Sequence, residues 1–137
     1  MAAGSNCDIL YIEGNPDDVV FFQRAFEKAD MPCVVHIVDT IPVAVCYLKG
    51  EPPYTDRAAF PIPHLIVTDL AIRLDAGIQF VHWLRSQTAF ANIPIICLSS
   101  TQDPAKLAAI RHLAVTFVEK SVLFEGVMGF IRAALPI

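Results

Sequence analysis

The chain has 137 residues, and 55% of them are hydrophobic, which is enough apolar material for the core of one domain. Its net charge of -4 argues against a nucleic-acid partner, since binding by counterion release needs a basic surface. No segment approaches the roughly 18 apolar residues of a membrane span, so we expect no membrane contact. The four cysteines form no C-x-x-C motif, and we therefore expect buried, reduced thiols in a cytoplasmic protein.

The first predicted unit is a strand, a turn and a helix. Residues 7–12 are mostly apolar and predict a strand that is covered on both faces. Asn15 is a typical N-cap, and Pro16 suits the first helical position. Asp17 and Asp18 then favour the positive end of the helix dipole. Apolar residues recur at helical spacing after this turn, so the helix has one buried face.

The alternation of strand and helix continues along the rest of the chain. A Pro-rich connection separates the second helix from the third strand, because its four prolines oppose regular structure. Further strands are predicted at 33–38, 65–68, 94–98 and 115–118, and helices at 40–49, at 78–86, from Asp103 and from Ser121.

This alternation predicts an α/β fold in which five helices cover both faces of a five-stranded parallel sheet. For this length, the flavodoxin-like, doubly wound strand order 2-1-3-4-5 is the leading choice. Its crevice opens at the carboxyl ends of the first and third strands. Glu13 and Asp69 lie there, and Ser99 and Lys120 follow the fourth and fifth strands at the same edge.

These crevice residues favour a cation over a flavin phosphate. Alone, an acid or serine after a strand is usually a turn residue or helix cap, and a lysine is usually a solvated charge. Together, Glu13 and Asp69 suit a hard divalent cation such as Mg²⁺. An aspartate beside such a cation can accept a phosphoryl group. Ser99 and Lys120 would supply a hydrogen-bond donor and a positive charge to the product.

The sequence resembles the receiver domains of bacterial two-component response regulators over essentially its whole length. The stretches that carry the resemblance are "NPDDV", "NIPIICLSS", "FVEK" and "YLKGEPPYTDRAAFPIPHLIVTDL". The last, with its long Pro-rich loop, is similar to stand-alone receivers that partner phytochrome-type sensor kinases. The resemblance implies a signalling domain rather than an enzyme.

The family's functional residues are carried over by position. The resemblance implies that Asp69 is the phosphoacceptor and that the Ser99 hydroxyl bonds the phosphoryl group. It implies that Lys120 pairs with the phosphoryl oxygens and that Phe117 is the aromatic switch residue. The backbone carbonyl of Ala71 would be a metal ligand.

The implied Mg²⁺ site departs from the family pattern in one acid. Glu13 matches the first of two acids that accompany Asp69, but Gly14 stands where the second should be. We therefore expect Mg²⁺ to bind more weakly than in an ordinary receiver. Asp17 is a candidate substitute, although the family's acid in this turn matches Asp18.

Two functions remain open from the sequence. In the first, a sensor histidine kinase phosphorylates Asp69 in a phosphorelay, and the domain signals by protein contact. In the second, the domain is an atypical receiver that binds partners without phosphorylation. The retained Asp69, Ser99 and Lys120 favour the first, which is the leading hypothesis. Gly14 favours the second, as do Arg73 and Ser121, which replace prolines of the family. A small phosphohydrolase or flavoprotein is less favoured than either, because no second catalytic acid follows Asp69 at the expected spacing and the loop after the first strand does not suit a flavin phosphate.

The chain ends soon after the last predicted helix. We therefore expect residues 1–137 to form a single receiver domain without an output domain, so that any signal leaves by protein contact. We also expect a homodimer through the face formed by the fourth helix, fifth strand and fifth helix. The residues expected to be exposed there are Val122, Phe124, Met128 and Phe130.

Overall fold

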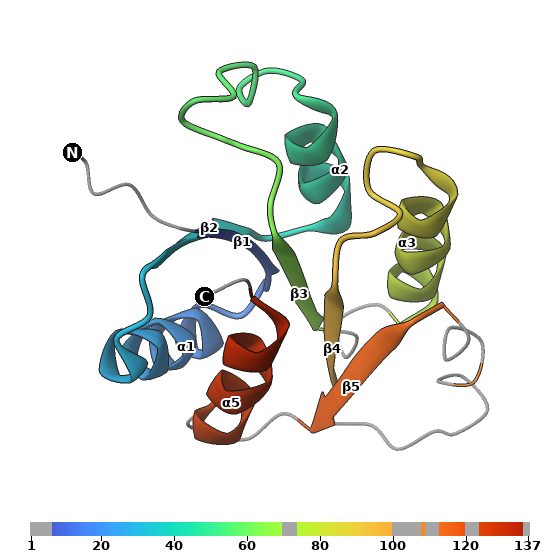
Figure 1. Ribbon diagram of the computed structural model, residues 1–137. Helices are drawn as coiled ribbons and strands as arrows, with labels where there is room; N and C mark the ends of the chain where they lie inside the picture. The colour runs from blue at the N-terminus through green and yellow to red at the C-terminus, as the bar shows by residue number, and fades with distance from the viewer. Residues whose placement is uncertain (1–6, 70–73, 100–107, 109–112, 120–123, 136–137) are drawn as a thin grey trace.

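The computed structural model describes residues 7–69, 74–99, 108, 113–119 and 124–135, and Figure 1 shows their arrangement. All strand pairings are parallel, and the sheet order is β2-β1-β3-β4-β5. The flavodoxin-like prediction is thereby confirmed. The strands are β1 (Cys7–Ile12), β2 (Cys33–Val38), β3 (Leu65–Asp69), β4 (Ile95–Ser99) and β5 (Val115–Glu119).

Helices cover both faces of the sheet (Figure 1). One core cluster lies under α1 (Pro16–Ala29) and α5 (Glu125–Ala134). A second lies under α2 (Ile41–Lys49) and α3 (Leu74–Ser86). Of the helix expected from Asp103, the structure describes only residue 108, which is helical. Among the helices that are described, none combines the length and hydrophobicity of a membrane span.

The N-termini of α1 and α2 follow the predicted capping chemistry. The Asn15 side chain accepts a hydrogen bond from the Asp17 amide at 2.9 Å, and Pro16 begins the helix. Thr40 accepts one from the Val43 amide at 3.3 Å. These local side-chain bonds need no tertiary partner, which is why the sequence indicates them.

The other two helices begin elsewhere than predicted. α3 begins at Leu74 rather than Ile78, because its first turn carries no apolar periodicity to detect. α5 begins at Glu125, and its N-cap is Phe124 rather than the predicted Ser121, which lies outside the described residues. The Phe124 ring is fully buried, 5.6 Å from that of Phe22. Tertiary packing therefore sets the start of α5.

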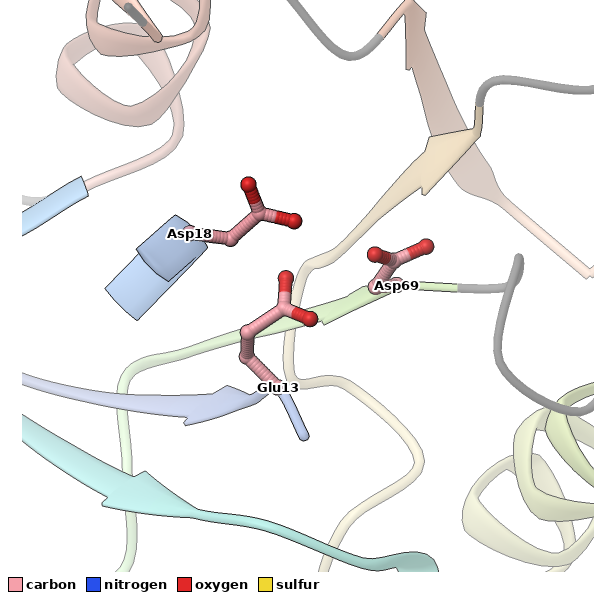
Figure 2. A group of neighbouring side chains, drawn as sticks. All are labelled: Glu13, Asp18 and Asp69. Carbon is pink, nitrogen blue, oxygen red and sulfur yellow. The ribbon is translucent and has the colours of Figure 1, made fainter. Parts of the chain in front are cut away.

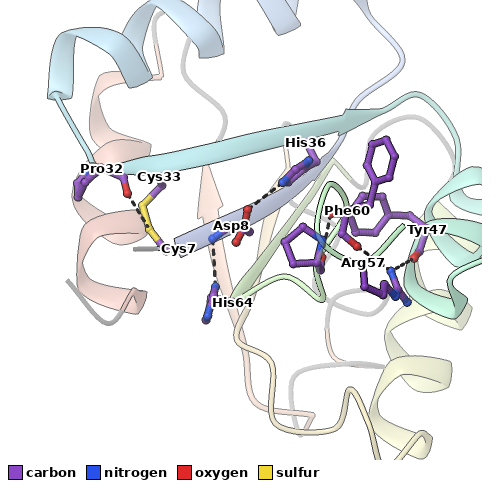
Figure 3. A network of polar contacts seen from close by, with 10 residues as sticks. Cys7, Asp8, Pro32, Cys33, His36, Tyr47, Arg57, Phe60 and His64 are labelled. Atoms are coloured by element: carbon purple, nitrogen blue, oxygen red, sulfur yellow. Dashed lines mark hydrogen bonds and ion pairs between the residues drawn. A yellow bond between two sulfur atoms is a disulfide. The ribbon is translucent and has the colours of Figure 1, made fainter. Parts of the chain in front are cut away.

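Two cysteines are joined, contrary to the expectation of reduced thiols. Cys7 and Cys33 are direct partners in the pairing of β1 with β2, and they form a disulfide with a Cα–Cα distance of 4.7 Å (Figure 3). Cys46 and Cys97 are free. The prediction was wrong for the first pair because a sequence separation of 26 carries no sign of proximity until the strands pair.

The Pro-rich connection is anchored to the end of α2 (Figure 3). Arg57 donates hydrogen bonds to the carbonyls of Tyr47 and Phe60 at 2.8 and 3.0 Å. The Tyr47 hydroxyl donates to the Pro61 carbonyl at 2.9 Å. The ring of Tyr54 lies 5.1 Å from each of the rings of Tyr47 and Phe60. This loop is therefore held in place by aromatic packing and by capping of the α2 carbonyls.

The expected dimerisation face is less apolar than predicted. Phe124 and Met128 are buried, with 0% and 7% exposure, because they belong to the inward stripe of α5. Phe130 is 49% exposed, as expected. Val122 lies outside the described residues. The prediction was wrong for Phe124 and Met128, since the sequence alone left the rotation of this helix undetermined.

Candidate functional site

Three carboxylates meet at the carboxyl edge of the sheet (Figure 2). Glu13 directly follows β1, Asp69 ends β3, and Asp18 lies in the first turn of α1. One oxygen from each carboxylate lies within 4.8 Å of the others. Glu13 and Asp69 are only 2% and 7% exposed, whereas Asp18 is half-buried. The fold thus concentrates negative charge at one point of the crevice.

Neighbouring donors hold the Glu13 carboxylate in place. The Tyr11 hydroxyl donates a hydrogen bond to its Oε1 at 2.9 Å, and the Asn15 amide donates to its Oε2 at 3.2 Å. Tyr11 and Glu13 are two residues apart and so lie on the same side of the strand. Burial, followed by the charge of Glu13, raises the pKa of Tyr11 far above its ordinary value. The hydroxyl therefore stays protonated and continues to donate.

The third carboxylate comes from Asp18 and not from the candidate substitute Asp17. Asp17 is exposed, while Asp18 points toward Glu13 and Asp69 (Figure 2). Successive residues of an α-helix are rotated by about 100°, so two adjacent acids cannot face the same strand ends. Gly14 itself is exposed and offers no side-chain ligand.

This arrangement suits a divalent cation. Carboxylates this close repel one another, and a cation between them offsets that repulsion. Clustered oxygen ligands are the donor set that hard divalent cations prefer. Glu13, Asp18 and Asp69 therefore supply three carboxylates, although Gly14 stands where the family resemblance implies a further acid.

The remaining predicted residues are only partly described. Ser99 is the last residue of β4, one position beyond Leu98, which pairs with Asp69. Phe117 lies in β5 opposite Cys97 and packs, half-buried, against the core under α2 and α3. The predicted residues outside the described part of the chain are Ala71, Arg73, Lys120 and Ser121.

Sequence reasoning missed two contributors to this site. The strand pattern alone does not single out Tyr11, although its spacing of two from Glu13 indicates a shared face. Asp18 favours the helix dipole and matches the family's acid in this turn, but the sequence does not show that its carboxylate joins those of Glu13 and Asp69. The contact of Asp18 with the cluster depends on how α1 is oriented on the sheet, whereas Tyr11 and Glu13 meet on one side of the same strand.

The solved structures to which this chain is similar include several response regulators. A bacteriophytochrome response regulator, RtBRR, is 27% identical over 96% of this chain and 78% of its own, with a TM-score of 0.79. The phosphorylated cyanobacterial phytochrome response regulator RcpA is 25% identical over 95% and 94%, with a TM-score of 0.83. The Mn²⁺-bound form of the response regulator Rcp1 is 22% identical over 90% and 91%, with a TM-score of 0.79.

No family model matches the chain, and no curated protein matches it significantly. The structural likeness is nevertheless extensive, since it covers 96% of this chain for RtBRR and 95% for RcpA. The chain has the fold of response regulator receiver domains, and its resemblance to the phytochrome-associated members of that family is confirmed.

Proposed function

We propose that the protein is the phosphoryl-accepting receiver of a two-component phosphorelay. The observation that carries this proposal is the cluster of Glu13, Asp18 and Asp69 at the carboxyl edge of a receiver sheet. A sheet with this fold but without the acids would favour a passive interaction module. Three acids brought together from two strand ends and a helix instead favour retained phosphoryl chemistry.

Asp69 is the proposed phosphoacceptor. A carboxylate oxygen of Asp69 attacks the phosphorus of a phosphohistidine on a sensor kinase, so that a new O–P bond forms as the N–P bond breaks. The histidine nitrogen keeps the electron pair of the broken bond. Glu13 and Asp18 would hold Mg²⁺ with Asp69, and the cation would neutralise charge on the transferred group.

The other proposed roles follow the family pattern. Lys120 would pair with the phosphoryl oxygens, the Ser99 hydroxyl would donate to them, and the backbone carbonyl of Ala71 would bind the cation. Phe117 would change position when Asp69 is phosphorylated. It packs half-buried at the edge strand β5, where a rearranged ring would alter the surface offered to a partner.

The proposed kinase partner is phytochrome-type, because the compared receivers with identities of 25% and 27% are phytochrome response regulators. We place this signalling in the cytoplasm.

Homodimerisation through the fourth helix, β5 and α5 remains part of the proposal, and Phe130 of α5 is exposed and apolar. Replacement of Phe130 with Glu should then convert a dimer into a monomer in light scattering. A wild-type monomer at micromolar concentration would refute the dimer.

Incubation with acetyl phosphate and Mg²⁺ tests phosphoryl acceptance directly. The intact mass should rise by one phosphoryl group in the wild type and remain unchanged in Asp69→Asn. An ordinary receiver treated in parallel shows that the conditions support labelling. If that receiver gains mass and the wild-type protein does not, the proposal fails and the phosphorylation-independent interaction module takes its place.

A further inference from the structure

A large cavity lies beside the carboxylate cluster, between the start of α2 and α3. Its volume is about 680 Å³, within the roughly 300–1,000 Å³ that is typical of small-molecule sites. Ile12 at the end of β1 and Asp69 at the end of β3 contribute to its wall. The cavity therefore opens at the carboxyl edge of the sheet, where ligands of parallel α/β folds bind.

One wall of the cavity is aromatic. Phe80 and Trp83 of α3 both line it, and their rings are stacked, with centroids 6.2 Å apart and an angle of 19° between their planes. Phe80 is only 3% exposed and so is fixed in the core. Ile41 and Val45 of α2 line the opposite side. A flat, apolar ring system would fit between these two helices.

The ionisable groups in the described lining are both acids. They are Asp39, which directly follows β2, and Asp69. Within the described part of the chain, Asp39 forms no hydrogen bond or ion pair, and it is exposed to solvent at the cavity. A positive charge on the ligand would thus be attracted by Asp39, and apolar rings of the ligand would contact Trp83.

We propose that this cavity binds a small organic cation whose flat, apolar rings lie against Trp83 and whose charged group faces Asp39. The volume favours a free small molecule over a single inserted side chain, since one amino-acid side chain would leave most of 680 Å³ empty. The proposal does not depend on phosphoryl transfer, and it is tested on the unphosphorylated protein.

Two planar three-ring probes of opposite charge separate shape from charge. Proflavine is a cation at neutral pH, and anthracene carboxylate is an anion of similar size. Trp83 is the chain's single tryptophan and lines the cavity, so quenching of its fluorescence reports binding. Equilibrium dialysis gives the stoichiometry. We expect one proflavine molecule to bind to each chain, with an affinity at least tenfold higher than that of anthracene carboxylate.

Three variants locate the site. Asp39→Asn should weaken proflavine binding about fivefold, because it removes one charge that is largely exposed to solvent. It should not weaken binding of anthracene carboxylate. Asp30→Asn is the matched control, because Asp30 is also exposed but lies at the far end of α1. Val45→Trp should weaken proflavine binding by narrowing the space between α2 and α3. Equilibrium dialysis measures this effect, because the new tryptophan adds its own fluorescence, and circular dichroism verifies folding. Equal affinity for both probes would overturn the proposal, as would proflavine binding that is unaffected by Asp39→Asn.

Discussion

Replacement of Asp18 with Asn tests whether its carboxylate belongs to a metal centre. The acidic oxygens lie within 4.8 Å of one another, so a cation among them is closer than this to each. Coulomb's law gives roughly 1.7 kcal/mol for a divalent cation and one carboxylate at 4.8 Å in a water-like dielectric. Asp18 is half-buried, which makes the water-like value a low one. The loss of this charge should therefore weaken Mg²⁺ binding about eighteen-fold or more.

Asp17→Asn is the matched control for this experiment. Asp17 lies in the same first turn of α1 but is exposed and outside the cluster. Both variants lose a favourable charge near the helix N-terminus, an effect of about 0.3–1 kcal/mol on stability. Only Asp18→Asn should also lose metal affinity. Isothermal titration of the metal-free proteins with Mg²⁺ measures the difference.

Gly14→Asp supplies the complementary arm. A carboxylate at position 14 should restore Mg²⁺ affinity to the Asp18→Asn variant, because it adds charge where the family has its second acid. Equal weakening by Asp17→Asn and Asp18→Asn would refute the assignment of Asp18 to the metal centre. So would an Asp18→Asn variant that binds Mg²⁺ as tightly as the wild type.

Three further predictions concern stability and thiol chemistry. The buried Thr68 hydroxyl has no hydrogen-bond partner in the described part of the chain, so Thr68→Val should raise the free energy of unfolding by about 1 kcal/mol in urea; a decrease would contradict this. Burial raises the pKa of the Cys97 thiol from 9.0 to about 12. Between these two values the unfolded chain releases the thiol proton and the folded protein keeps it, so the free energy of unfolding should fall by about 1.4 kcal/mol per pH unit from pH 9 to pH 12. Cys97→Ala should flatten the pH dependence of urea unfolding in that range, whereas a slope that matches the Cys46→Ala control would refute this origin. Thiol titration of the denatured, unreduced protein should find two free thiols, Cys46 and Cys97, and four would exclude the disulfide between Cys7 and Cys33.

Local chemistry explains why much of the fold could be predicted. The Asn15 and Thr40 caps and the apolar strands depend on residues close in sequence, so they are visible without tertiary information. The start of α5 could not be predicted in this way. It depends on Phe124, whose ring packs against Phe22 of a helix more than ninety positions away in the chain.

The sequence by itself determined the alternation of strands and helices, the parallel sheet order and the meeting of Glu13 with Asp69 at one edge. These follow from apolar periodicity and from the handedness of parallel crossovers. Only the tertiary structure decided that Asp18 rather than Asp17 joins them, because that choice depends on the rotation of α1 about its axis. The cavity next to the cluster was likewise decided by the packing of α2 and α3 on the sheet.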